Sequence, residues 1–283
     1  MSVHIVTDSG SDINYALDPC VSVLPLGVTF GSVTYQDGVD LTQDRFYELL
    51  VEGTDHPQTS QVTPFAFAQE FDRIDAADRQ AQILVVALSS GLSGTCASAQ
   101  TAAEERSNVR VFDSYSVCIT QHAYVRYAVQ LVHQGLSTDE IYDQLMAVRG
   151  RVRLVALFDT MEYLKRGGRI PKAVNAVGNL LNIKPVIGVR EGEVALLGQA
   201  RGSKNGRNQI RKQVEKEGVD WTLPIEFGYT GFSDELLQTY LADNRDLWEE
   251  HLGTGNLSIH RVGATIGTHA GPGAIAVGYF CAA

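Results

Sequence analysis

Short apolar runs alternate with amphipathic stretches along most of the chain, and this alternation predicts a repeated strand–helix order. The clearest run is 83–88, six consecutive apolar residues between polar turns. Such a run is typical of a strand buried on both faces of a parallel sheet. Further apolar runs predict strands at 3–7, 21–30, 109–112, 153–158, 225–229, 258–262 and 275–280.

Helix starts are marked by capping residues. Thr42 precedes the amphipathic segment 43–52, Thr63 and Pro64 open a helix through Ile74, and Ser137 with Glu140 forms a capping box. Further helices are expected at about 96–105, 116–134, 161–165, 171–181 and 234–248, and the segment 201–207 leads into a basic helix with Arg211 and Lys212 beyond. Strands that alternate with helices predict a parallel sheet covered on both faces. A second unit begins near residue 151 and contains a hairpin at 183–197.

The turn 89–95, which reads Ser-Ser-Gly-Leu-Ser-Gly-Thr, follows the strand 83–88 directly and leads into a helix. Backbone N–H groups at a helix start favour a negative group, and small residues let that group approach closely. The same residues also suit a simple N-cap without a ligand. No lysine follows Gly94, which excludes a P-loop, and the segment is one residue short of the Gly-x-Ser-x-Gly elbow of esterases.

Other polar segments end predicted strands or interrupt helices. They are the turn 8–12, the hydroxyl pair Thr59-Ser60, Arg169 after two glycines, the basic segment 201–212, and His269 in a Gly- and Pro-rich loop. Loop polarity, a surface arginine and a solvated helix face explain these features individually. A histidine held in such a loop is also well placed to donate a hydrogen bond into a cleft.

Composition narrows the functional classes. The 283 residues carry a formal charge of -10, which argues against general binding of nucleic acid. The four cysteines, at 20, 96, 118 and 281, are scattered, so we expect free thiols in a reducing cytoplasm and no zinc site built on them. We find no apolar stretch of membrane-spanning length, and we expect no signal peptide at the start.

Several short motifs occur in a fixed order from one end of the chain to the other. They are Val6-Thr7-Asp8-Ser9, Leu24-Pro25-Leu26, Asp37-Gly38, Thr59-Ser60-Gln61, the turn 89–95, Asp113-Ser114, Tyr163-Leu164, Gly167-Gly168-Arg169-Ile170, Lys184-Pro185, Arg201-Gly202 with Lys204, and His269 with Gly271-Pro272-Gly273-Ala274. In this order the chain resembles the DegV family, which includes the fatty-acid-binding FakB proteins. Two positions depart from the family pattern. Val62 replaces a common proline and Cys96 a common aromatic residue.

The resemblance implies an α/β fold of two domains. Residues 1–150 would form a parallel sheet flanked by helices, and residues 151–283 a second α/β domain with a mixed sheet. A long-chain fatty acid such as palmitate, stearate or oleate would lie in the cleft between them, with no cofactor and no metal. We expect the apolar lining to include Leu26, Val28, Phe30, Leu92, Ile170 and Leu180.

The resemblance also implies residue roles. The carboxylate would be held by Thr59 and Ser93, with Ser90 as the next candidate, near His269 and Arg169. Arg201 and Lys204 match a segment that docks to a kinase subunit. The protein would therefore be a cytoplasmic lipid carrier and not an enzyme, presenting the acid to a separate fatty acid kinase. We also expect that the protein contacts membranes transiently without stable insertion and that it does not bind nucleic acid.

Two alternatives from other functional classes remain open on the residues alone. One is a serine acyl hydrolase that uses Ser93 with His269 and takes Asp8 or Asp113 as the acid partner. The other is a protein that binds a phosphorylated metabolite at the same helix start.

Overall fold

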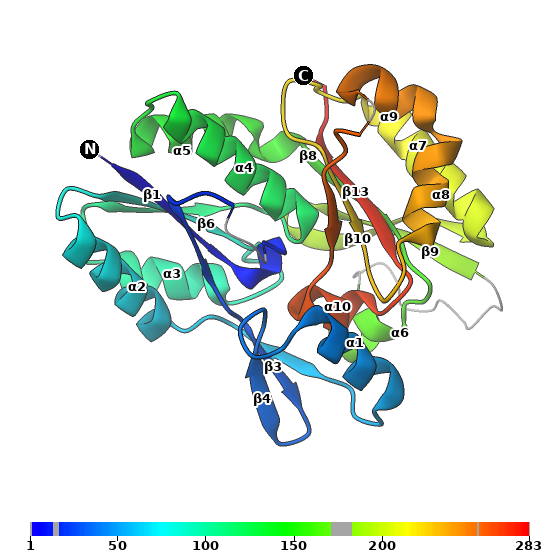
Figure 1. Ribbon diagram of the computed structural model, residues 1–283, viewed down its shortest axis with the longest axis horizontal. Helices are drawn as coiled ribbons and strands as arrows, with labels where there is room; N and C mark the ends of the chain where they lie inside the picture. The colour runs from blue at the N-terminus through cyan, green and yellow to red at the C-terminus, as the bar shows by residue number, and fades with distance from the viewer. Residues whose placement is uncertain (1, 14–16, 171–182, 254, 283) are drawn as a thin grey trace.

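The computed structural model describes residues 2–13, 17–170, 183–253 and 255–282. Two lobes, each built on its own sheet, lie side by side (Figure 1). We call the part up to residue 151 the first lobe and the part from residue 152 onward the second lobe. The boundary expected at 150/151 falls in a short 3-10 helix, η2 (Arg149–Arg151), between the last helix of the first lobe and the first strand of the second.

The main sheet of the first lobe has four parallel strands in the order β2-β1-β6-β7. The strands are β1 (Val3–Asp8), β2 (Val21–Leu24), β6 (Gln82–Ala87) and β7 (Val109–Asp113), and a 3-10 turn, η1 (Ser9–Ser11), follows β1. Helices cover both faces: α2 (Pro64–Ala77) and α3 (Thr95–Ala103) on one, α4 (Ile119–His133) and α5 (Thr138–Val148) on the other. This is the parallel, doubly covered sheet that the apolar runs predict.

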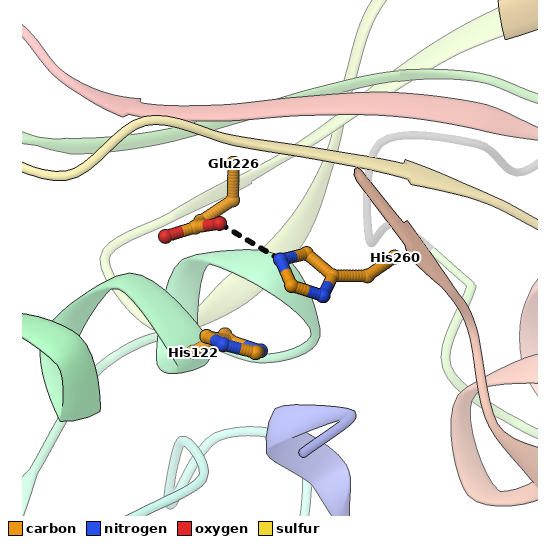
Figure 2. Close-up of side chains that lie close together, drawn as sticks. All are labelled: His122, Glu226 and His260. Atoms are coloured by element: carbon orange, nitrogen blue, oxygen red, sulfur yellow. Dashed lines mark hydrogen bonds and ion pairs between the residues drawn. The ribbon is translucent and has the colours of Figure 1, made fainter. Parts of the chain in front are cut away.

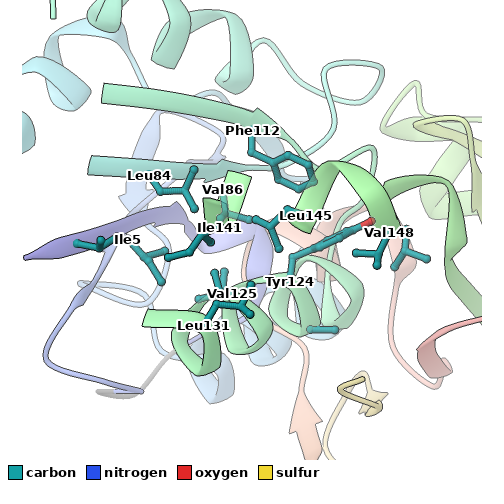
Figure 3. Packing of buried hydrophobic residues seen from close by; sticks show 14 of the residues in the cluster. Ile5, Leu84, Val86, Phe112, Tyr124, Val125, Leu131, Ile141, Leu145 and Val148 are labelled. Atoms are coloured by element: carbon teal, nitrogen blue, oxygen red, sulfur yellow. The ribbon is translucent and has the colours of Figure 1, made fainter. Parts of the chain in front are cut away.

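Strand β6 shows why its sequence is apolar throughout. Ile83 and Val85 pack under α2 and α3, whereas Leu84 and Val86 face α4 and α5. Successive side chains on a strand point to opposite faces, so a strand covered on both sides needs apolar residues at every position. Figure 3 shows the second of these cores, in which Tyr124 of α4 packs beside Phe112 of β7.

The second lobe contains a six-stranded mixed sheet in the order β10-β9-β8-β13-β11-β12. The strands are β8 (Val152–Leu157), β9 (Ile183–Arg190), β10 (Glu193–Arg201), β11 (Glu226–Tyr229), β12 (Ile259–Arg261) and β13 (Ile275–Phe280). The helices α7 (Ser203–Glu217), α8 (Glu235–Asp243) and α9 (Arg245–Leu252) lie on the face turned away from the first lobe (Figure 1).

A small third sheet, β4-β3-β5, closes the lower side of the molecule in Figure 1. It is formed by β3 (Gly27–Phe30), β4 (Val33–Gln36) and β5 (Gln58–Ser60), with α1 (Gln43–Glu52) beside it. Two short helices of the second lobe, α6 (Glu162–Arg166) and α10 (Ala264–Ala270), meet this region. The apolar cluster around Phe46 and Tyr47 includes Ala264 of α10, so the two lobes share this core.

Local capping contacts explain why the helix starts predicted from the sequence agree with those in the structure. Thr42 and Thr63 accept hydrogen bonds from Arg45 N and Ala66 N, and Ser137 forms its capping box with Glu140. These contacts depend on residues close in sequence, and the predicted starts of α1, α2 and α5 are confirmed.

Four elements of local structure differ from those predicted from the sequence. The run 21–30 forms two strands in different sheets, because Pro25 lacks an N–H for the ladder. Thr59 lies in strand β5 and His269 in helix α10, where loops were expected. The helix at 234–248 is two helices, since the buried Asn244 side chain donates to Tyr240 O and ends α8. The helix expected at 171–181 lies outside the described residues.

Within the described part of the chain, no helix combines the length and apolar character needed to cross a bilayer.

Candidate functional site

A cavity of about 340 Å³ lies between the two lobes. Its volume is at the lower end of the ~300–1,000 Å³ range usual for small-molecule sites. Most of its wall is apolar, and both lobes contribute to it. The first lobe supplies Leu26, Thr59, Ser60, Gln61, Leu88, Leu92, Ser93, Gly94, Val117 and Cys118. The second lobe's larger share includes Leu154, Phe158, Ile187, Val189, Tyr229, Val262, Ile266 and Ile275.

The hollow arises from small residues in register on neighbouring strands. Ala276 of β13 pairs with Ala156 of β8 on one side and Gly228 of β11 on the other, and all three line the cavity. The next row along these strands, Val155, Val277 and Phe227, faces the opposite way and packs beneath α7 to α9. Because the alternation places small side chains on one face only, that face leaves space where the other is filled.

Polar groups gather where β5, the turn after β6, and α10 meet at the cavity. Thr59 Oγ1 and His269 Nε2 share a hydrogen bond of 3.0 Å. Both side chains line the cavity and are partly exposed. The hydroxyl and the imidazole thus form a pair at the wall of an otherwise apolar space.

Two aspartates of the first lobe hold α10 in place. Asp37 accepts hydrogen bonds from Ala264 N at 3.1 Å and Thr265 N at 3.0 Å, and Asp12 accepts one from Gly263 N at 2.7 Å. These carboxylates cap the N-terminus of the helix, where the dipole favours negative charge. His269 therefore reaches the cavity through a helix whose start is fixed from the other lobe.

Ser93 sits in the turn before α3 and lines the cavity. Its Oγ lies 2.9 Å from Thr95 Oγ1 and accepts a hydrogen bond of 3.2 Å from Thr95 N. Thr95 Oγ1 in turn accepts from Val62 N, the residue after the Thr-Ser-Gln segment. This chain of contacts ties the turn that carries Ser93 to the segment that carries Thr59.

Gln61 makes the same connection from the other side. Its Nε2 donates to Ser98 Oγ at 2.8 Å, and its Oε1 lies only 2.1 Å from where a Cβ at Gly94 would be. A side chain at position 94 would displace Gln61, so the glycine is needed for this close approach.

Arg169 follows α6 and also lines the cavity. Its guanidinium donates to Leu92 O at 3.2 Å and to Gly167 O at 2.7 Å. The arginine therefore bridges the turn beside Ser93 and the loop after α6. A planar cation in this position complements a carboxylate.

His269 is neutral at pH 7. Burial, assisted by the charges of Arg169 and His56, lowers its pKa to about 4. Gly167 lies directly against the ring, where a Cβ would come within 2.1 Å of Nδ1. Within the described residues, Nδ1 itself has no hydrogen-bond partner.

The remaining predicted residues are placed as follows. Ser90 is exposed, its N–H donates to Asp113 Oδ1, and it is not among the cavity-lining residues. Arg201 at the end of β10 and Lys204 in the first turn of α7 are both exposed. Of the expected apolar lining, Leu26 and Leu92 line the cavity, Val28, Phe30 and Ile170 do not, and Leu180 lies outside the described residues.

Sequence reasoning missed several supporting residues. Thr95, Gln61 and Gly167 hold the polar groups in place, and Cys118 reaches the cavity wall. Cys96 is buried in the core of the first lobe. The motifs flagged the segments around these residues, but contacts between segments more than 30 residues apart leave no local pattern.

The pairings that an acyl hydrolase would need do not form here. His269 bonds to Thr59, while Ser93 bonds to Thr95. Asp8 accepts from Leu88 N, Gly10 N and Gln121, and Asp113 accepts from Ser90 N and Tyr115 N. The acids proposed for a triad are thus engaged elsewhere.

Comparison with known proteins assigns a family. The model of the DegV family, which is described as uncharacterised, matches residues 2–282. A DegV domain-containing protein of Deinococcus radiodurans is 34% identical over 284 residues, with 98% of each chain covered. Another, from Caldanaerobacter subterraneus, is 30% identical over 279 residues, with 97% of each chain covered.

Solved structures share the fold along the entire chain. A DegV family protein from Thermus thermophilus, described by its fatty acid binding, has a TM-score of 0.87 at 30% identity, with 100% of both chains covered. DegV of Bacillus subtilis, described as a fatty acid binding protein, has a TM-score of 0.82 at 26% identity, again with 100% of both chains covered. The Streptococcus pneumoniae fatty acid kinase B3 protein loaded with linoleic acid has a TM-score of 0.86 and 100% coverage of both chains. Its 23% identity establishes the fold alone.

Proposed function

This chain belongs to the DegV family, and from that premise we propose that it binds one long-chain fatty acid in the cavity between its lobes. The observation that carries the proposal is the cavity itself, whose largely apolar wall includes the donors Thr59, Ser93, Arg169 and His269. Each methylene that leaves water contributes about 0.8 kcal/mol, so roughly ten methylenes are enough for tight binding. The fatty acid binding described for the Thermus and Bacillus proteins supports this ligand class.

The carboxylate of the ligand would lie at the polar group of the cavity. Thr59 and Ser93 supply hydroxyl donors, Arg169 supplies a cation, and neutral His269 supplies a ring nitrogen. A buried carboxylate without such partners would be costly, which explains why the donors gather at one place. Because Ser90 is exposed and away from the cavity wall, the proposal assigns the hydroxyl contact to Ser93.

We also propose that the chain is a carrier that presents the acid to a separate fatty acid kinase, and that it works in the cytoplasm. The partly exposed Thr59 and Ser93 would leave the head group within reach of a partner's active site. Arg201 and Lys204, exposed at the junction of β10 and α7, form the proposed docking segment. Four free cysteines fit a reducing compartment.

The other functional classes have weaker support. A hydrolase would need His269 beside Ser93, and each of these side chains has another partner. A phosphorylated metabolite would make no apolar contact with most of the cavity wall. Neither alternative accounts for the row of small residues that opens the space.

The proposal is tested by native mass spectrometry of the full chain as purified, followed by identification of the released lipid. We expect one fatty acid per chain, which is lost on delipidation and restored by added palmitate. A chain that carries no lipid and takes up none of a set of long-chain acids would contradict the proposal.

A further inference from the structure

Three side chains with metal-ligating atoms meet at the junction of the lobes. His122 comes from α4 of the first lobe, whereas Glu226 and His260 come from β11 and β12 of the second (Figure 2). Their ligand atoms all lie within 4.8 Å of one another. Glu226 Oε2 is 2.8 Å from His260 Nε2, and the two imidazole rings lie 4.1 Å apart between centroids, at an angle of 35°.

The cluster is removed from water. His122 and Glu226 are both 0% exposed, and the side chain of His260 is 9% exposed. A metal ion would bind these side chains with both imidazoles neutral and the carboxylate ionised.

Glu226 and His260 each have a further contact. Arg126 donates to Glu226 Oε1 at 2.6 Å and leaves Oε2 turned to His260, as the supporting partners of ligands in metal sites do. Ser258 Oγ accepts a hydrogen bond from Arg126 at 3.1 Å and lies 2.9 Å from His260 Nε2, the nitrogen that also contacts Glu226, so a bound ion would displace this contact as well.

We propose that His122, Glu226 and His260 form a binding site for a divalent transition-metal ion of the zinc class. Two imidazoles and one carboxylate favour zinc or its neighbours over magnesium and calcium, which prefer oxygen ligands. The ion would take the place of the hydrogen bond between His260 and Glu226 Oε2, with water as a further ligand. Bonds of 2.0–2.1 Å in a tetrahedron put the ligand atoms about 3.3 Å apart, so the cluster would contract by at most ~1.5 Å.

Such an ion would join the two lobes beside the cavity wall. Cys118, the N-cap residue of α4 four positions before His122, lines the cavity. So do Gly228 and Val262, which follow Glu226 and His260 by two residues each. Because the ligands come from both lobes, the bound ion would resist their separation. Binding to the folded state alone raises the unfolding temperature by mass action, which gives a second readout.

The test refolds the full chain with Zn²⁺ or Co²⁺, since the buried ligands admit an ion most readily before folding is complete. The metal retained is then measured after dialysis against a nitrilotriacetate buffer. We expect one Zn²⁺ per chain and a higher unfolding temperature than in the metal-free chain. H122Q and H260Q should each lose the ion, and H133Q, which alters an exposed histidine bound to Asp18, should keep it.

Three results would contradict the proposed metal site. The wild type could take up well below one ion per chain, the wild type, H122Q and H260Q could retain the ion equally, or H133Q could lose it. If H122Q and H260Q fail to fold, the Co²⁺ spectrum of the wild type decides. Visible bands of a tetrahedral nitrogen and oxygen site support the proposal, and a thiolate charge-transfer band would assign the ion to cysteine instead.

Discussion

Thr59 and His269 are separated by 210 positions in the chain, yet Thr59 Oγ1 and His269 Nε2 share a 3.0 Å hydrogen bond at the wall of the cavity. Thr59 belongs to the small sheet of the first lobe, and His269 to the last helix of the second. The aspartates that cap α10 come from the first lobe, so both partners are held by contacts between the lobes. The polar end of the cavity therefore exists only when the lobes are assembled.

Removing the Thr59 hydroxyl is expected to weaken fatty-acid binding. Thr59→Val keeps the shape of the side chain but deletes a donor to the carboxylate, which should cost about 1–3 kcal/mol, or roughly 5- to 150-fold in affinity. Displacement of a fluorescent fatty acid measures the change. Thr29→Val is the matched control, because Thr29 lies on the neighbouring strand and bonds to Thr34 instead. Equal affinities of the two variants would remove Thr59 from the site.

The two serines of the turn provide a direct comparison. Ser93→Ala should lower affinity by a similar factor, since Ser93 lines the cavity. Ser90→Ala should leave it unchanged, because Ser90 is exposed and away from the wall. Isothermal titration of both variants with palmitate decides between them, and a larger loss in Ser90→Ala would reverse the assignment.

Filling the hollow is expected to exclude long acyl chains. Ala276→Leu adds bulk in the row formed by Ala156, Ala276 and Gly228, and displacing two methylenes would cost about 1.6 kcal/mol, roughly a tenfold loss in affinity. Ala195→Leu, on β10 and outside the cavity lining, is the control. Affinity for palmitate is compared after circular dichroism confirms that both variants are folded. Unchanged binding in Ala276→Leu would mean that the chain of the acid lies elsewhere.

The pKa of His269 predicts how the delipidated chain responds to acid. Its folded pKa of about 4 lies below the ordinary 6.5, so the unfolded state binds more protons between these values. Stability contributed by the neutral ring is therefore present above pH 6.5 and lost as the pH falls toward 4. Urea unfolding at pH 7 and pH 4.5 should show a decline that is smaller in His269→Gln by about 1–3 kcal/mol. Identical declines in both proteins would show that His269 does not titrate in this way.

The docking segment is tested by reversing its charge. Arg201→Glu with Lys204→Glu should reduce acyl phosphate formation by a fatty acid kinase, because a complementary surface would become repulsive. Palmitate uptake should stay the same, since neither side chain lines the cavity. The double variant Arg79→Glu with Arg110→Glu, at two exposed sites on the first lobe, makes the same change in net charge and is the control. If uptake and phosphorylation fall together, the segment has a structural role.

Features encoded by neighbouring residues could be predicted from the sequence. The apolar run that forms β6 and the caps Thr42, Thr63 and Ser137 depend on residues close in sequence, and the elements they predict are present. Helix α10 was missed because its caps, Asp12 and Asp37, lie more than 200 positions away. The bonds that place Thr59 and Ser93 through Thr95 and Gln61 are likewise long-range. Nothing in the sequence indicated the proposed metal-binding cluster either, because His122, Glu226 and His260 are far apart in the chain and meet only where the lobes join.

The central claim is that the cavity holds an acyl chain whose carboxylate lies beside Thr59, Ser93 and His269. The most direct measurement titrates the delipidated chain with palmitate and with methyl palmitate, which share the tail and differ in the charged head. Saturation at one palmitate per chain is predicted, with affinity for the ester lower by about tenfold or more because it carries no charge for the donors to meet. Equal affinities for the acid and the ester, or no saturable binding of palmitate, would contradict the account.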